Sequence, residues 1–308
     1  MLYHILALLT VAVWGITFVS TKTLIAAGLA PAQIFFARFL LAYAGIWLLT
    51  LCRKGKPSLW AKSLKDEAIM LLLGLTGGSL YFLTENTALE YTQACNTSFI
   101  VCSAPLLTIL LTLAARRFGS GRLAKGQQKL SFNANILLGT LLCIAGVALV
   151  VFNGTRLHIS PKGDILALAA ALCWACYSVI MGAVSEDYDS VFITRKVFFY
   201  GLLTIVPVLP GYDFPGWDVL TGGDVVLNLL FLGIVASLVC FVVWNLVLAK
   251  IGNVTATNYV YLNPFFTLVS AMILLDESLT VLAAVGCLAI VAGVVLSTVT
   301  PRSRSGVR

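Results

Sequence analysis

Long apolar runs that carry almost no charge follow one another along this chain, and they constrain its fold more than any other feature. A helix needs about 20 apolar residues to cross the roughly 30 Å hydrocarbon core of a bilayer. The runs have about that length, so each predicts one membrane-spanning helix. The ten expected spans are Leu2–Thr21, Ala32–Leu51, Ala68–Leu89, Cys95–Ala115, Asn135–Phe152, Asp164–Ala183, Val191–Leu209, Val225–Leu248, Val254–Leu275 and Leu279–Val299.

The amino-acid composition agrees with this interpretation. The chain has 308 residues, of which 60% are hydrophobic and 11% are charged. A soluble domain is roughly 45–50% apolar and about 25% charged, because its surface faces water. So few ionic groups could not cover a water-facing surface of this size. The expected fold class is therefore an all-α integral membrane protein of ten transmembrane helices in the lipid bilayer.

The basic residues predict the orientation of these spans. Of the 20 Lys and Arg residues, three lie on the side opposite the termini (Lys22, Arg156, Lys162) and three inside expected spans (Arg38, Arg195, Lys196). The remaining 14 lie on the side of the termini. Because cytoplasmic loops carry an excess of Lys and Arg, both termini are expected in the cytoplasm, with the chain in a plasma or bacterial inner membrane. The net charge of +7 is then a topology signal, and no nucleic-acid partner is expected.

The chain also contains an internal repeat. Residues 71–108 align without a gap against 230–267, and residues 5–18 align against 165–178. The alignments pair Trp14 with Trp174, Gly74 with Gly233, Phe82 with Phe241, Asn86 with Asn245, Leu89 with Leu248 and Pro105 with Pro264.

This repeat predicts the domain organisation. A unit of five spans occurs twice, and an odd number of spans forces the two copies into opposite orientations across the membrane. Inverted repeats of this kind are typical of secondary transporters. We expect one five-helix repeat over residues 1–153, a second over 163–300, and a basic cytoplasmic tail over 301–308.

Several motifs resemble a known family when taken in order. They are "VWGITFVSTK" in the first span, "RFLLAYAGIW" in the second, "ENTALEYTQACNTSFIVCSAPLLTILL" across the third and fourth, and "GNVTATNYVYLNPFFTLVSAMILLDESLT" followed by "VGCLAIVAGVVL" near the end. Together with the duplication, they make the chain similar to the EamA-type ten-helix proteins of the drug/metabolite transporter superfamily. The resemblance implies a central cavity between the repeats, alternating access by rocking, and export as the usual direction.

A Cys-x-x-Cys pair, Cys173 and Cys176, raises the alternative of thiol redox chemistry. Such chemistry needs a thiolate, and the middle of an apolar span disfavours one. We therefore interpret the spacing as accidental, and take Trp174 between the two cysteines as the informative residue because it pairs with Trp14 in the repeat.

Charged residues inside the spans are candidates for coupling or gating. Glu85 is the acidic residue that lies well inside a span, and a buried carboxylate there is a functional candidate by default. The alternatives are that Glu85 reaches the nearby surface, or that it pairs structurally with Arg38 near the outer end of the second span. Arg38 and Arg195 are related by the repeat, and both gate-lining and fold-stabilising roles stay open for them.

Polar and aromatic residues inside the spans are the candidates for substrate binding. Amides and hydroxyls in a membrane bond either to a neighbouring helix or to a substrate, and both alternatives stay open for each residue. Asn263 precedes Pro264, which lets the helix kink and frees carbonyl groups to line a cavity. The candidates are Trp14, Thr17, Asn86, Trp174, Tyr177, Asn245, Asn258, Tyr261 and Asn263.

These observations predict a secondary transporter, and specifically an exporter, of small metabolites such as amino acids or amphipathic amines. The sequence has no phosphate-binding Gly-x-x-x-x-Gly-Lys motif, so transport would be facilitated or coupled to an ion, with protons as the candidate ion. Phosphorylated substrates are less expected, because no Lys or Arg is expected near the middle of the membrane. No catalytic residue, metal or cofactor is expected.

Two alternative functions stay open: a flippase for a lipid-linked carrier, and a membrane receptor that binds without transporting. The monomer and the homodimer are both compatible with the sequence.

Overall fold

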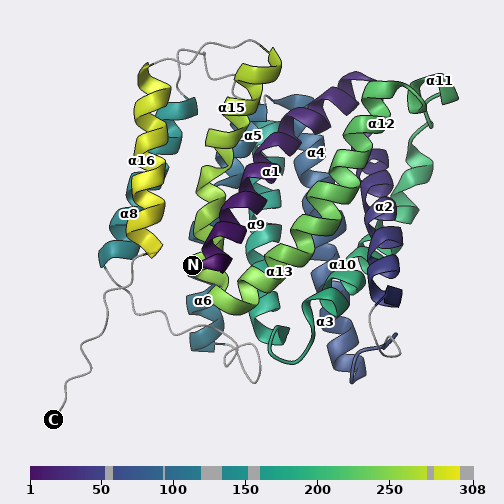
Figure 1. Cartoon of the computed structure of the whole chain (residues 1–308), viewed down its shortest axis with the longest axis horizontal. Coiled ribbons are helices and arrows are strands. Elements are labelled where there is room, and N and C mark those ends of the chain that lie inside the picture. Colours follow the sequence, from purple (N-terminus) through teal and green to yellow (C-terminus); the bar gives the residue numbers. More distant parts are fainter. Residues whose placement is uncertain (53–57, 93, 119–133, 152–159, 276–280, 299–308) are drawn as a thin grey trace.

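The computed structural model describes residues 1–52, 58–92, 94–118, 134–151, 160–275 and 281–298. These residues form helices and turns without a single strand, packed side by side in a bundle (Figure 1). The predicted basic tail 301–308 and the predicted span ends at Phe152, Leu279 and Val299 lie outside the described residues.

The first half of the chain contributes two long uninterrupted helices and two interrupted ones. A π-helical segment with a kink at Gly78, η1, joins α3 to α4, and a two-residue turn separates α5 from α6. The bounds are α1 Leu2–Ala26, α2 Pro31–Cys52, α3 Leu64–Gly74, η1 Leu75–Ser79, α4 Leu80–Tyr91, α5 Ala94–Val101, α6 Ala104–Phe118 and α8 Ala134–Val151.

The second half repeats this pattern. Another π-helical segment, η3, joins α12 to α13, and a 3-10 segment, η4, joins α14 to α15. The bounds are α9 Pro161–Val184, α10 Ser190–Ile205, η2 Val206–Gly211, α11 Trp217–Leu220, α12 Gly223–Leu230, η3 Phe231–Val239, α13 Cys240–Ile251, α14 Asn253–Thr257, η4 Asn258–Leu262, α15 Asn263–Leu275 and α16 Val281–Thr298.

Seven helical segments among the described residues are long and apolar enough to cross a membrane. They include α1, α2, the α3–η1–α4 segment and the α12–η3–α13 segment, and each coincides with a predicted span. The all-helical membrane fold is therefore confirmed. Helices α8, α15 and α16 are shorter, so the total of ten spans stays a prediction with which the structure is compatible.

Local sequence signals set the helix starts outside the apolar runs. The Ser63 hydroxyl accepts a hydrogen bond from the backbone N–H of Asp66 and caps α3, and Asp189 caps α10 through the N–H of Val191. Ser160 begins α9 in the same way, with Pro161 as its first residue. The first N–H groups of a helix have no partner inside it, so these caps fix where the helices begin.

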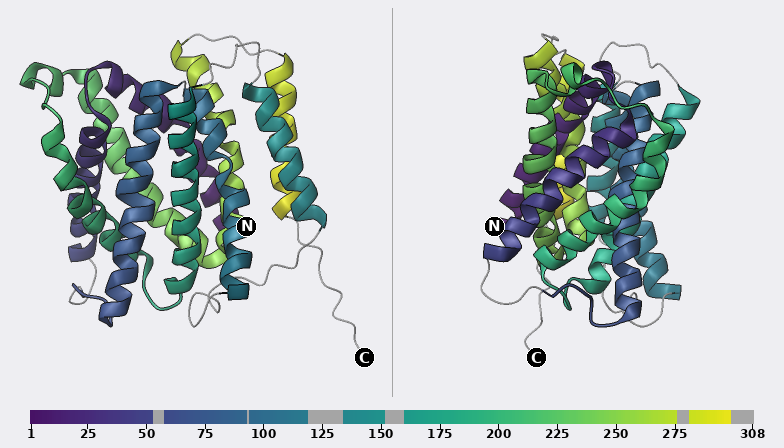
Figure 2. Two further views of the ribbon diagram at one scale, coloured as in Figure 1. Left: turned by 180° about the vertical axis from the view of Figure 1, so that it is seen from behind. Right: turned by 90° about the vertical axis from the view of Figure 1, so that its right-hand side faces the viewer.

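Small residues allow the helices to approach closely. A Cβ atom at Gly74 would collide with Tyr200 of α10, and one at Gly15 would collide with Phe266 of α15. Gly146 and Gly293 bring α8 against α16, and Figure 2 shows this pair standing together at one edge of the bundle. Since lipid tails are as apolar as the helices, such close packing is a main source of association between spans.

The helix interruptions fall at corresponding positions of the two halves. The gap-free alignment pairs residues 75–79, which form η1, with 234–238 inside η3. It also pairs the turn after α5 with the end of η4, so α6 and α15 begin at paired residues, Ala104 and Asn263. Each of these two residues is followed by a proline, whose missing N–H explains why the helix is interrupted there.

Candidate functional site

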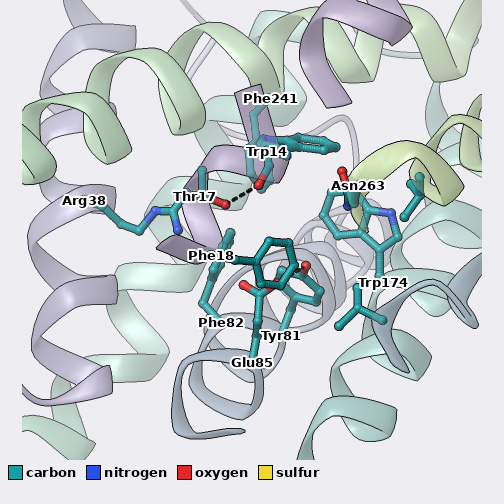
Figure 3. A pocket seen from close by; sticks show the side chains of 12 residues that line it. Trp14, Thr17, Phe18, Arg38, Tyr81, Phe82, Glu85, Trp174, Phe241 and Asn263 are labelled. Atoms are coloured by element: carbon teal, nitrogen blue, oxygen red, sulfur yellow. Dashed lines mark hydrogen bonds between the residues drawn. The ribbon is translucent and has the colours of Figure 1, made fainter. Parts of the chain in front are cut away.

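A cavity lies in the middle of the bundle, where helices from both halves of the chain meet (Figure 3). The cavity and its mouth hold about 410 Å³ of space free of atoms, but the centre of a water-sized sphere fits in only about 20 Å³ of it. That leaves room for about one water molecule, so a metabolite could bind only if the cavity widened. Its lining residues are Trp14, Thr17, Phe18, Arg38, Tyr81, Phe82, Glu85, Val101, Trp174, Phe241, Val260 and Asn263.

The apolar walls of this cavity are built largely from residues that the repeat pairs. Trp14 and Trp174 meet edge to face with their ring centroids 5.2 Å apart. Phe82 and Phe241 lie 6.2 Å apart, and the Tyr81 ring lies 5.1 Å from that of Trp174. Aromatic rings in such offset arrangements attract one another beyond the effect of burial alone, which gives the walls a defined shape.

The interrupted helices also reach the cavity. Val101 is the last residue of α5, and its repeat mate Val260 lies in η4; both line the cavity. The two interruptions touch, because the Cys102 thiol lies 3.4 Å from the carbonyl oxygen of Val260. Interrupted spans at matching positions of two halves often mark the binding site of a transporter.

Arg38 reaches the cavity from α2. Its Nε donates a hydrogen bond of 3.0 Å to the Ser237 hydroxyl in η3, and its guanidinium carbon lies 4.2 Å from the centre of the Phe82 ring. Arg38 is only 1% exposed. Among the described residues, its two terminal nitrogens have no hydrogen-bond partner.

Glu85 enters the same cavity from α4. Its Oε1 accepts a hydrogen bond of 2.7 Å from the Tyr81 hydroxyl, one helical turn earlier, and the residue is 6% exposed. In the part of the chain that the structure describes, its Oε2 accepts no hydrogen bond, and Glu85 forms no ion pair with Arg38. Among the described residues, Arg38 and Glu85 therefore line one space without forming an ion pair.

Two further polar atoms of cavity residues have no hydrogen-bond partner within the part of the chain that the structure describes: the indole Nε1 of Trp174 and the amide Oδ1 of Asn263. Both residues are 4% exposed. The Trp14 indole, by contrast, donates to the carbonyl oxygen of Ala236 in η3 at 3.0 Å. Buried polar groups are nearly always paired. Among the described residues, unpaired polar atoms also occur away from this cavity, at Trp244 and Thr140 among others, so the cavity is distinguished by Arg38 and Glu85 rather than by these two atoms.

The sequence predicts Arg38 near the outer end of its span, and phosphorylated substrates are less expected because no Lys or Arg is expected near the middle of the membrane. The structure puts the Arg38 guanidinium at the cavity, because its side chain runs inward over Phe82 to Ser237. Glu85 does not reach the surface either, since it is buried against Tyr81.

The structure brings six of the predicted site residues together at the cavity: Trp14, Thr17, Arg38, Glu85, Trp174 and Asn263. Asn86, Tyr177 and Asn245 lie elsewhere and join helices. The Asn86 amide donates to the carbonyl oxygen of Pro31 at 3.2 Å, and Asn245 accepts from the Tyr177 hydroxyl and donates to Thr194 at 2.8 Å. These contacts correspond to the interhelical alternative.

The last three predicted residues also lie away from the cavity. Asn258 and Tyr261 are each 1% exposed in η4, and Tyr261 faces a separate apolar pocket beside α5 and α8. Arg195 donates to the carbonyl oxygen of Ser58 and lies over the ring of Trp47, near the C-terminal end of α2.

Sequence reasoning missed Tyr81, Phe82 and Phe241 as cavity residues. The repeat alignment already paired Phe82 with Phe241, and Tyr81 precedes Glu85 by four residues, which places both on one helix face. The sequence therefore contained evidence that could have identified all three as cavity residues. Phe18, Val101 and Val260 had no chemical signal that separates them from lipid-facing residues.

Comparison with known proteins gives consistent results. The profile of the EamA-like transporter family matches residues 1–118 and 161–299. An "Uncharacterized transporter" of Archaeoglobus fulgidus is 30% identical over 301 residues, covering 96% of each chain. A "Probable amino-acid metabolite efflux pump" of Escherichia coli is 26% identical over 99% of this chain and 97% of its own.

Two more distant matches agree with these. A "Probable terminal-alkyne amino-acid exporter" of Streptantibioticus cattleyicolor is 25% identical over 94% of this chain and 90% of its own. A solved crystal structure superposes with a TM-score of 0.73 at 17% identity, covering 96% of this chain and 98% of the other. At that identity, the likeness concerns the fold alone.

Proposed function

Because this chain belongs to the EamA-like transporter family, we propose that it is a secondary exporter of small metabolites, such as amino acids or amphipathic amines. Its spans make it a multi-pass membrane protein. The proposed mechanism is alternating access between two inverted five-helix repeats, residues 1–153 and 163–300. No catalytic reaction is part of the proposal.

One observation carries this proposal: the charged, partly unpaired cavity is enclosed by residues from both halves and by their interrupted helices. A binding site at the contact between two halves becomes open to one side or the other when the halves rock.

The π-helical segments supply places where the spans can bend. The backbone at Gly78 in η1 departs from helical geometry, with φ −126° and ψ −108°, and Gly78 packs against Gly201 of α10. η3 is bound by Trp14 and Arg38, which are cavity residues of the other half. Because π-helical segments bend a helix locally and are common at functional sites, we assign η1 and η3 as the hinges of the rocking motion.

The names of relatives support the substrate class and the direction. Two of the relatives above are named for the efflux or export of amino-acid compounds. We extend this to the present chain as a proposal, with protons as the candidate coupling ion at Glu85. The orientation with both termini in the cytoplasm, in a plasma or bacterial inner membrane, is proposed on the distribution of basic residues.

Reconstitution into liposomes tests the function. The purified chain is expected to move at least one compound of a labelled panel of amino acids, amines and neutral metabolites across the bilayer, faster than protein-free liposomes do. Saturable binding without flux would indicate a receptor instead. Movement of a lipid-linked carrier between leaflets, with no flux of soluble compounds, would indicate a flippase.

A further inference from the structure

The cavity contains one positive and one negative group, both buried and not paired with each other. Arg38 is 1% exposed and Glu85 is 6% exposed, and both line the same space. In Figure 3, Arg38 points into the cavity from one side and Glu85 rises from α4 on another, with Phe18 and Phe82 near them. A buried charge without a partner is costly, so each group is expected to gain a partner of opposite charge when a ligand binds.

We infer that the cavity selects zwitterions: Arg38 binds the carboxylate and Glu85 binds the ammonium group of one small molecule, whose apolar side chain lies against the aromatic walls. This inference rests on the proposed transport function and names the substrate class within it. It also decides between the two classes proposed above, amino acids and amphipathic amines.

The hydrogen-bonding geometry of Arg38 suits a carboxylate. Its Nε is held by the Ser237 hydroxyl and its plane lies over the Phe82 ring, so the guanidinium is fixed in orientation. The two terminal nitrogens stay available among the described residues. Two parallel N–H donors match the two oxygens of a carboxylate.

The acceptors at the cavity suit an ammonium group. An ammonium donates three hydrogen bonds and accepts none. Glu85 has one oxygen that accepts no bond among the described residues, and the Oδ1 of Asn263 has no partner. The rings of Trp14 and Trp174 add faces that attract a cation.

Ligands with only one charge fit this cavity less well. A simple amine would pair with Glu85 and leave Arg38 buried without a partner. A monocarboxylate would leave Glu85 unpaired, and a phosphate ester would bring a second negative charge close to it. Only a molecule with both charges gains a partner for both groups, and a hydrogen bond to a charged group contributes about 1.5–3 kcal/mol, which is about 10- to 100-fold in affinity.

Matched ligands test this inference without any change to the protein. Calorimetric titration of the purified full-length chain would compare L-phenylalanine with 2-phenylethylamine, which lacks the carboxylate, and 3-phenylpropionate, which lacks the ammonium group. The same set built on L-leucine, with 3-methylbutylamine and 4-methylpentanoate, covers a smaller side chain. In at least one set, the amino acid is expected to bind about tenfold or more tightly than both analogues.

Two variants then test which residue binds the carboxylate of the ligand and which binds its ammonium group. In Arg38→Gln, the advantage of the amino acid over the amine is expected to disappear, and in Glu85→Gln its advantage over the carboxylate is expected to disappear. Arg195→Gln is the matched control, because it removes a buried arginine that does not line the cavity. Both advantages should persist in it.

The outcomes separate this inference from the proposed function. If an amine or a carboxylate binds as tightly as the amino acid in both sets, the inference is wrong. It is equally wrong if none of the six compounds binds while the liposomes transport another solute, and in both cases the transport function stands. An absence of flux for every compound of the labelled panel would overturn the transport function itself.

Discussion

Two buried arginines of this chain lie in contrasting surroundings. Arg38 faces the central cavity, where its terminal nitrogens have no partner among the described residues and the nearby Glu85 forms no ion pair with it. Arg195 is bonded to the carbonyl oxygen of Ser58, and its neighbour Lys196 forms an ion pair with Glu67. Arg38 lines the cavity, while Arg195 joins α10 to the segment around Ser58.

The contrast shows why burial alone does not identify a functional charge. Arg38 and Arg195 are 1% and 5% exposed, so burial hardly distinguishes them. Each of them donates one hydrogen bond to another described residue, so hydrogen bonding does not distinguish the two arginines either. What differs is the acidic side chain nearby. The Glu67 carboxylate accepts from Lys196, from the Tyr200 hydroxyl and from the N–H of Ala61, whereas Glu85 accepts one bond, from Tyr81, among the described residues.

Replacing the cavity arginine is expected to have the largest effect. Arg38→Gln removes the donor pair for a carboxylate and should lower transport of the zwitterionic substrate by about 10- to 100-fold. Initial rates of flux into liposomes measure this change. The variant should elute from size-exclusion chromatography as the parent does; full transport by a correctly folded Arg38→Gln protein would remove the basis of the comparison.

Replacing the acid at the cavity should change how transport responds to pH. Gln is neutral at every pH, as a protonated Glu85 would be, so Glu85→Gln is expected to abolish the pH dependence of transport if Glu85 carries the coupling proton. Flux measured at a series of pH values, with Tyr81→Phe as a control that removes only the hydrogen bond to Glu85, tests this role. If the pH profile of Glu85→Gln were identical to that of the parent, Glu85 would not carry the coupling proton.

Breaking the ion pair beside Arg195 should affect stability rather than selectivity. Lys196→Met leaves Glu67 without its cationic partner in a partly buried position, with side-chain exposures of 6% for Lys196 and 12% for Glu67. We expect a loss of roughly 1–3 kcal/mol in the free energy of unfolding. Thermal unfolding in detergent measures the loss. A selectivity change as large as that of Arg38→Gln would contradict the view that the Lys196–Glu67 ion pair stabilises the fold and does not select the ligand.

The hydrogen bond that orients Arg38 is expected to matter less than Arg38 itself. Ser237→Ala removes the acceptor of Nε without removing the charge. A hydrogen bond to a charged group contributes about 1.5–3 kcal/mol, and only part of this loss is expected to reach the ligand, so affinity for the amino acid should fall by about three- to tenfold. Ser79→Ala is a control at the corresponding π-helical segment of the other half, since Ser79 bonds to Thr204 and not to a cavity residue. Equal losses in both variants would speak against a specific orienting role.

The smallest effect is expected at the Cys-x-x-Cys pair. Both Cys173 and Cys176 are free thiols and partly buried in α9. The interpretation of this spacing as accidental predicts that Cys173→Ser and Cys176→Ser each transport within about twofold of the parent, a change below 0.5 kcal/mol. Flux measured in the presence and absence of a thiol reductant checks this. A loss of activity that depends on the reductant would reopen the redox alternative.

Much of the fold could be predicted from the sequence, because each membrane span is one continuous apolar run of residues. The length and apolarity of the runs predict the helices, since a helix makes all its backbone hydrogen bonds within one segment and can therefore cross lipid. The repeat paired Trp14 with Trp174 and Phe82 with Phe241, and these residues do meet around one cavity. The repeat alignment therefore pairs the aromatic residues that form much of the apolar walls of the cavity.

The polar part of the site was harder to predict, because it depends on side-chain direction. Arg38 and Arg195 are equivalent by the repeat, but only Arg38 turns toward the cavity, where Ser237 accepts its bond. Asn245 looked like a ligand residue, but Tyr177 and Thr194 use its amide. Such three-dimensional pairing between distant segments leaves no periodic signal in the sequence.

Solute counterflow in liposomes tests the central claim most directly, because it requires one site that opens alternately to the two sides. Liposomes containing the purified chain would be loaded with unlabelled L-phenylalanine or L-leucine and diluted into a trace of the labelled compound. The account predicts a transient accumulation of label in liposomes with the parent chain and little or none with Arg38→Gln. Label that only equilibrates, or that never enters although the amino acid binds, would contradict it.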